Sequence, residues 1–110
     1  MRSAEIYYKD IPAGILTESD EGYYTFQYHK EYVTKYPKQF IAFSMPVNEK
    51  LYGYNRLFPF FEGLIPEGWL LDIASKNWKI NQNDRMGLLL ACCENCIGAV
   101  TVKPILQEDE

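Results

Sequence analysis

The sequence predicts an α+β domain in which about three helices pack on one side of a small antiparallel or mixed β-sheet. Three observations indicate this class: the first half of the chain has the period of β-strands, the second half changes to the period of helices, and a last β-branched run returns to strand character. A chain of 110 residues suits one domain with one core. We expect residues 1–106 to form this domain and residues 107–110 to be an acidic tail.

Short aromatic or β-branched runs predict the first three strands, at residues 6–9, 14–17 and 23–29. The polar turn at residues 18–22 predicts that the second and third strands form a hairpin. Tyr24, Phe26 and Tyr28 alternate with polar side chains, the period-2 pattern of a strand with one buried and one solvated face.

The middle of the chain predicts a mixture of short elements. Residues 30–36 suit one or two helical turns, which should end before Pro37 because a proline disfavours helix at the preceding residue. Residues 40–45 predict another strand, closed by Pro46, and residues 47–54 predict a loop.

Helical spacing of the apolar residues begins after Asn55. Asn55 can cap a short helix that runs to Leu64, and Pro66 suits the first turn of a second helix, where its missing N–H is not needed. One face of the second helix gathers the apolar side chains of Leu70, Ile73, Ala74 and Trp78. Trp69 projects away from that face, so we expect it to be exposed.

The last helix and strand complete the predicted fold. Asn81 and Asp84 have the spacing of a capping box, which predicts a third helix up to about Cys92. Its side chains expected to be buried are Met86, Leu88, Leu89 and Leu90. Residues 97–102 predict the closing strand.

The charge and the cysteine content of the chain indicate which classes of partner it can bind and in which cellular compartment we expect it. Lys and Arg number 11 against 15 Asp and Glu, a net charge of −4, which argues against a phosphate-binding surface and so against direct nucleic-acid binding. No apolar run approaches the roughly 20 residues needed to cross a bilayer, and no secretion signal precedes the three cysteines. We therefore expect no membrane partner and a location in the reducing cytoplasm.

Few residues suggest catalysis or metal binding. Cys92, Cys93 and Cys96, with His29, could form a zinc or redox site, but cysteines at the end of a helix meet the dipole end that disfavours a thiolate. Buried, inert thiols are the favoured interpretation. No phosphate loop and no nucleophile and base pair can be assigned, so we expect no catalytic residue, cofactor or metal.

Lysines interleave with aromatic rings between residues 30 and 40: Lys30, Lys35 and Lys38 with Tyr32, Tyr36 and Phe40. Such a mixture can bind single-stranded nucleic acid by stacking and charge neutralisation. The acidic total and Glu31 oppose that function. A solvated lysine face with its rings packed into the core is the better interpretation.

The corner at residues 60–69 is the best candidate for a binding site. A rigid, exposed tryptophan beside proline and glycine at a helix start is typical of a protein-interface hot spot, although Trp69 could instead cap the core. The predicted partner-binding residues are Pro66, Glu67, Gly68, Trp69 and Leu70.

Six short blocks, in this order, resemble the N-terminal subdomain 1 of HipA-type toxin kinases: residues 14–16 (Gly-Ile-Leu), 24–28 (Tyr-Thr-Phe-Gln-Tyr), 43–46 (Phe-Ser-Met-Pro), 60–68 (Phe-Phe-Glu-Gly-Leu-Ile-Pro-Glu-Gly), 88–89 (Leu-Leu) and 97–100 (Ile-Gly-Ala-Val). They span about residues 13–104. One departure is Cys93-Glu94-Asn95, which stands where the family usually carries Gly-x-Asp.

The resemblance implies a non-enzymatic protein, because the ATP-binding and catalytic residues of full-length members belong to a kinase core that would follow residue 110. It implies a stand-alone, HipS-like antitoxin of a three-gene HipBST-type module. There HipS counteracts the HipA-like serine/threonine kinase HipT, and the helix-turn-helix protein HipB, which binds DNA, could join a ternary complex. Glu67 could then pair with a cationic residue of the kinase cleft. The alternatives are a regulatory subdomain cut from a full-length HipA-like kinase and, more distantly, a thiol or metal-binding protein.

Overall fold

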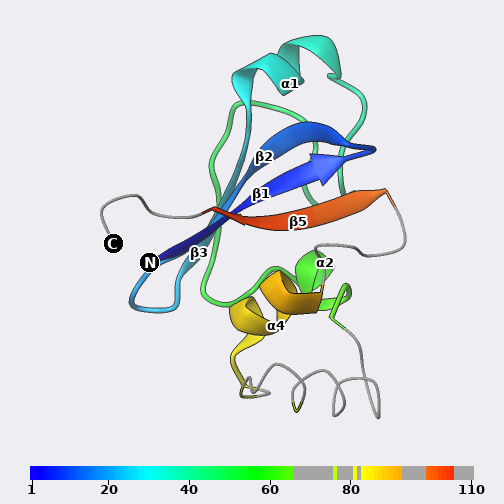
Figure 1. Ribbon diagram of the computed structural model, residues 1–110. Helices are drawn as coiled ribbons and strands as arrows, with labels where there is room; N and C mark the ends of the chain where they lie inside the picture. The colour runs from blue at the N-terminus through cyan, green and yellow to red at the C-terminus, as the bar shows by residue number, and fades with distance from the viewer. Residues whose placement is uncertain (66–75, 77–80, 82, 93–98, 106–110) are drawn as a thin grey trace.

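The computed structural model describes residues 1–65, 76, 81, 83–92 and 99–105 (Figure 1). It confirms the α+β class: a five-stranded sheet in the order β4-β3-β2-β1-β5, with every neighbouring pair antiparallel. The strands are β1 (Arg2–Tyr8), β2 (Ile11–Glu18), β3 (Tyr24–Tyr28), β4 (Tyr52–Tyr54) and β5 (Val100–Ile105). The described helices are α1 (Lys30–Lys35), α2 (Pro59–Glu62) and α4 (Arg85–Cys92).

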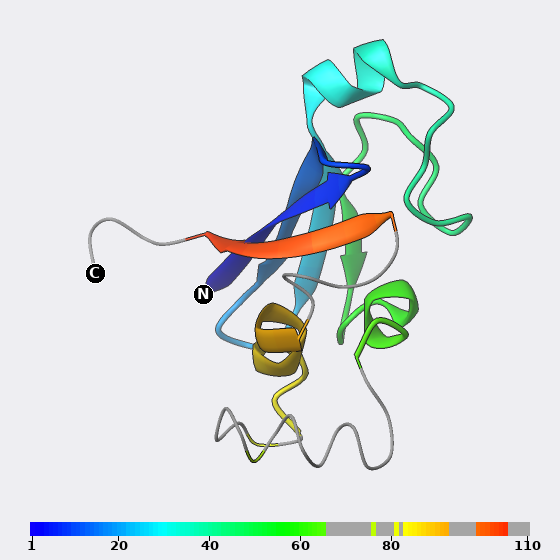
Figure 2. The same ribbon diagram turned by 45° about the vertical axis from the view of Figure 1, so that its right-hand side comes forward.

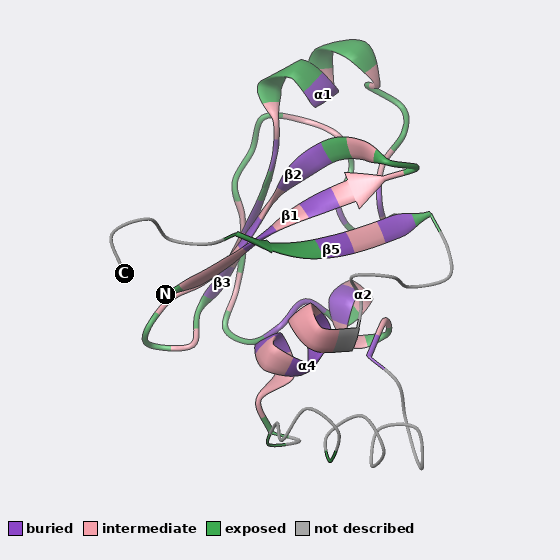
Figure 3. Cartoon of the chain, viewed as in Figure 1, coloured by how far each residue is buried: buried purple, intermediate pink, exposed green. Residues whose placement is uncertain are grey.

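One face of the sheet supplies most of the core. Ala4 pairs with Leu16, and Leu16 with Phe26, so these three buried residues lie in a row across β1, β2 and β3. Helices α2 and α4 lie against this side of the sheet, whereas α1 lies at the opposite end of the strands (Figures 1 and 2). Buried residues are found on the strands, on α2 and α4, and at one position of α1 (Figure 3).

The predicted hairpin of the second and third strands and the alternation in β3 are confirmed. β2 pairs with β3 across the predicted polar turn. Tyr24, Phe26 and Tyr28 are buried, Thr25 is half-buried and Gln27 is exposed, as a strand with one solvated face requires.

The prediction of a strand at residues 40–45 is wrong. Ala42 and Met45 form an isolated bridge that closes a tight turn, with the Met45 N–H donating to the Ala42 carbonyl at 3.0 Å. The loop predicted at residues 47–54 is also wrong at its end, because Tyr52–Tyr54 adds to β3 as a short edge strand. Contacts with the rest of the fold decide the structure of this segment, and the local sequence does not reveal those contacts.

The sequence predicts that two helices begin at Asn55 and Asn81, and the structure shows a different start for each. α2 begins at Pro59 with Phe58 at the N-cap, because proline at the first helical position needs no N–H partner. α4 begins after Asp84, whose Oδ1 accepts the N–H of Gly87 at 3.2 Å, while Asn81 Oδ1 accepts the N–H of Asn83 at 2.8 Å. Asp84 is therefore the cap itself and not the third residue of a capping box.

The expected burial of α4 is largely confirmed, since Met86, Leu88 and Leu89 are buried and Leu90 is half-buried. The predicted second helix lies outside the described residues except for Lys76, which is helical and exposed. Within the part of the chain that the structure describes, no helix is long and apolar enough to cross a membrane.

Candidate protein-binding surface

The five predicted partner-binding residues, Pro66, Glu67, Gly68, Trp69 and Leu70, lie outside the described residues. The structure instead describes the chain on both sides of them. α2 and the three residues that follow it lead to Pro66, and α4 begins at Arg85, fifteen residues after Leu70. The geometry of the leading flank determines where the segment starts.

The leading flank is fixed by aromatic packing. Phe61 of α2 is fully buried, and its ring centroid lies 6.0 Å from that of Phe26 in β3 and 6.1 Å from that of Phe58. Ile65, the last described residue before Pro66, is also buried. Helix α2 and its continuation are thereby held in the core up to the predicted corner.

An ion pair joins the leading flank to the trailing flank. Arg85, at the start of α4, donates from Nη2 to Glu62 Oε1 at 2.8 Å and from Nε to the same oxygen at 3.1 Å. Because Glu62 is the last residue of α2, this forked contact ties the end of one helix to the beginning of the other.

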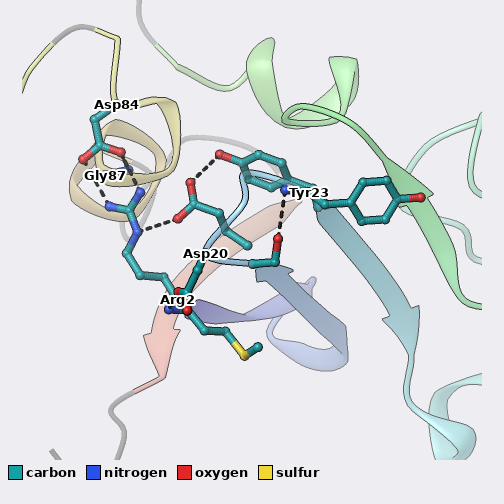
Figure 4. A network of polar contacts seen from close by, with 9 residues as sticks. Arg2, Asp20, Tyr23, Asp84 and Gly87 are labelled. Carbon is teal, nitrogen blue, oxygen red and sulfur yellow. Dashed lines mark hydrogen bonds and ion pairs between the residues drawn. The ribbon is translucent and has the colours of Figure 1, made fainter.

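A second charged network ties α4 to the sheet (Figure 4). Arg2 of β1 donates from Nη2 to Asp84 Oδ1 at 2.7 Å and from Nε to Glu18 Oε1 at 2.7 Å. The Tyr24 hydroxyl donates to the other oxygen of Glu18 at 2.9 Å. The N-cap of α4 is therefore held by an arginine on the neighbouring sheet.

The network shifts the proton affinities of its members in consistent directions. Hydrogen bonds to Asp84 and Glu18 raise the pKa of Arg2, and the hydrogen bond from Arg2 lowers the pKa of Asp84. Burial, followed by the hydrogen bond to Glu18, raises the pKa of Tyr24. The contact between the start of α4 and the sheet is consequently charged and intact at neutral pH.

The lysine and tyrosine segment has part of the arrangement that the sequence favoured: Tyr32 is in the core, whereas Tyr36 and Phe40 are half-buried. Tyr32 is buried and stacks on Tyr28 with ring centroids 5.7 Å apart, so its ring is not open to a base. Lys30 and Lys35 are exposed. A surface hollow of about 440 Å³ lies beside α1, lined by Ile11, Pro12, His29, Lys30, Glu31, Tyr32, Lys35 and Tyr36.

Of the possible catalytic and metal-binding residues, the structure describes the surroundings of His29 alone. His29 Nε2 contacts Glu5 Oε2 at 2.5 Å, and neither serine nor cysteine is its partner in the described chain. Over the residues that the structure describes, no group of three or more His, Cys, Asp or Glu side chains could hold a metal ion. Cys93 and Cys96 lie outside the described residues, as does the side chain of Cys92.

Sequence reasoning missed an exposed aromatic residue, Phe43. Its side chain is 90% exposed at the tip of the tight turn that replaces the predicted strand at residues 40–45. Pro37 and Pro46, which bracket this segment, are a signal for a loop that could have indicated the turn.

Comparisons with known proteins agree with this fold. The sequence model of the family described as HipA N-terminal domain matches residues 4–103. An uncharacterized protein of Haemophilus influenzae is 30% identical over 103 residues, which are 94% of this chain and 92% of that protein. A solved structure, "N-terminal domain of HipA toxin", superposes with a TM-score of 0.74 at 25% identity, covering 98% of this chain and 96% of that one.

Proposed function

Because the chain belongs to the HipA N-terminal domain family, we propose that it is a non-enzymatic antitoxin that binds and neutralises a HipA- or HipT-like serine/threonine kinase. The proposal rests on the part of the HipA toxin that this chain resembles. The similarity covers the N-terminal domain of a HipA toxin over nearly its whole length, and that domain is not the kinase catalytic domain. The Haemophilus influenzae relative has about the same length as this chain, which supports a protein that acts as a separate polypeptide.

The anchored leading flank supports residues 66–70 as the inhibitory contact. An interface residue contributes most when its backbone is ordered before binding, because little conformational entropy is then lost. The packing of Phe61 and Ile65 and the pairing of Glu62 with Arg85 provide such order in the residues that lead to Pro66. Trp69 would be the anchor, and Glu67 would pair with a cationic residue of the kinase cleft.

We propose the cytoplasm as the compartment and a ternary complex with a HipB-like helix-turn-helix protein as the larger assembly. In that assembly the helix-turn-helix protein would supply the contacts to DNA. The net charge of −4 makes direct DNA binding by this chain unfavourable.

Co-expression tests the proposal. The full chain is produced in bacteria together with the HipA-like kinase of the same organism, whose expression alone arrests growth. We expect growth to resume and the two proteins to co-purify. Continued arrest with both proteins soluble and abundant would contradict an antitoxin function.

The same assay tests the anchor. Trp69→Ala should leave the melting temperature nearly unchanged, while affinity for the kinase falls roughly thirtyfold and growth rescue weakens. Trp78→Ala is the matched control, since Trp78 is assigned to the buried face and its truncation should lower the melting temperature instead. If Trp69→Ala unfolds the protein and Trp78→Ala does not, Trp69 belongs to the core and the anchor is elsewhere.

A further inference from the structure

The tight turn at residues 42–45, named here the Phe43 turn, displays one large apolar side chain between two buried ones. Phe43 is 90% exposed, whereas Ile41 and Met45 on either side are buried in the core. The ring of Phe43 is supported on one side by Phe40, with centroids 5.0 Å apart. Removing an exposed phenylalanine ring from water is favourable, so this position leaves a gain in binding free energy for a partner that covers it.

Tyrosine hydroxyls hold the Phe43 turn in place. Tyr28, on β3, donates to the Met45 carbonyl and accepts the N–H of Ile41 at 3.1 Å. Two further hydroxyls act on the same loop: Tyr32 donates to the Gln39 carbonyl and Tyr52 to the Pro46 carbonyl, each at 2.6 Å. The exposed ring is therefore presented by an ordered backbone, which reduces the entropy lost on binding.

The stretch of sequence that contains the Phe43 turn has a charge opposite to that of the remaining chain. Residues 30–50 contain four lysines and two glutamates, whereas the rest of the chain has seven basic and thirteen acidic residues. The four lysines, Lys30, Lys35, Lys38 and Lys50, are exposed. None of them makes an ion pair with any residue that the structure describes. Exposed lysines in the same stretch of sequence as an exposed ring favour a partner whose surface is acidic and contains an apolar pocket.

We propose that the Phe43 turn is a second docking element of the antitoxin, which inserts Phe43 into an apolar pocket of the partner kinase while the lysines of residues 30–50 favour an acidic surface near that pocket. This inference rests on the proposed function for the identity of the partner. It adds a contact surface separate in sequence from residues 66–70.

Nucleic acid is the competing occupant of a surface with lysines and an aromatic ring. Stacking platforms for single strands use several open rings, but Tyr32 is buried and Tyr36 is half-buried with its ring against that of Tyr32. One exposed phenylalanine on a chain of net charge −4 fits a protein pocket better.

Calorimetric titration of the full chain into the purified kinase tests the inference. Phe43→Ala should fold with an unchanged melting temperature and bind at least tenfold more weakly than the wild type. The matched control is Ile105→Ala, which truncates another partly exposed apolar side chain, 38% exposed, on β5; it should bind within about twofold of the wild type. Wild-type binding with Phe43→Ala equally tight would overturn the inference and leave the proposed function standing. No binding by the wild type would overturn both.

Two further measurements test whether the partner's surface is acidic and whether the Phe43 turn binds nucleic acid instead. The double variant Lys35→Glu, Lys38→Glu should bind the kinase at least tenfold more weakly, chiefly through slower association; tighter binding would contradict an acidic surface. A fluorescent 20-nucleotide single-stranded DNA should not bind to the wild-type chain at physiological salt. Binding of that DNA that is lost in Phe43→Ala would assign the turn to nucleic acid and overturn the inference.

Discussion

The Tyr28 hydroxyl connects the sheet to the Phe43 turn by acting as both donor and acceptor. Tyr28→Phe removes it and leaves the Met45 carbonyl and the Ile41 N–H without this partner in a buried region. A buried polar group without a partner costs about 1–3 kcal/mol, so we expect the free energy of unfolding to fall by about 2 kcal/mol. Urea denaturation measures this change. Tyr23→Phe, which alters a half-exposed ring, should change it by less than about 0.5 kcal/mol.

The Tyr28 hydroxyl should also make the stability of the protein depend on pH in the alkaline range. Burial raises the pKa of Tyr28 from an ordinary value of 10.0 to about 12, so the folded state favours the protonated hydroxyl. Its contribution to stability is complete below pH 10 and is lost as the pH rises through the interval up to about 12. Tyr28→Phe should therefore lose less stability than the wild type between pH 10 and 12. Parallel alkaline unfolding curves for the two proteins would show that this hydroxyl is not the titrating group.

Gly14 shows why one residue of the sheet has no side chain. A Cβ at this position would lie 2.5 Å from the Gln27 carbonyl oxygen and 2.8 Å from the ring of Phe26. Because the nearest atom belongs to the backbone of β3, we expect Gly14→Ala to destabilise the protein by about 1–3 kcal/mol. Gly63→Ala is the control, since a Cβ there meets nothing closer than 3.4 Å and should be tolerated. Equal thermal stability of both variants would contradict this account of the sheet.

At the scale of elements, the start of α4 depends on a residue at the other end of the chain. Asp84 caps the helix and also accepts two hydrogen bonds from Arg2. Asp84→Ala removes both functions and should cost about 1–2 kcal/mol, whereas Asp84→Asn keeps a capping oxygen and should cost less than about 1 kcal/mol, because the ion pair is partly exposed. Chemical denaturation at neutral pH measures both values. A cost for Asn equal to that for Ala would mean that the ion pair, and not the cap, fixes the helix.

Acid should weaken this contact. The hydrogen bond from Arg2 lowers the pKa of Asp84 below its ordinary 3.8, so the contribution of this carboxylate is present above that pH and disappears as the pH falls through the lowered value. Asp84→Asn should remove this part of the acid sensitivity.

The hairpin of β2 and β3 could be predicted because its polar turn and the alternation in β3 are local. The turn at residues 40–45 could not be predicted, since the hydroxyl that accepts the Ile41 N–H and donates to the Met45 carbonyl belongs to Tyr28 on β3. The start of α4 was misplaced for a similar reason: the sequence near Asp84 does not show that Arg2, 82 residues away, will bind it.

For the whole molecule, the family could be inferred from the order of six short blocks, and the HipA N-terminal domain match confirms it. The binding residues at 66–70 stay a prediction. Phe43 escaped sequence analysis because residues 40–45 predict a strand, whereas the structure forms a turn that places this ring in solvent.

Inhibition of phosphoryl transfer tests the central claim most directly. The purified HipA-like kinase is assayed with radiolabelled ATP and a protein substrate while the full chain is added up to and beyond an equimolar amount. We expect the chain alone to transfer no phosphate, and the activity of the kinase to fall to background near one chain per kinase. Kinase activity that is unchanged at saturating chain, or robust phosphoryl transfer by the chain itself, would contradict the account.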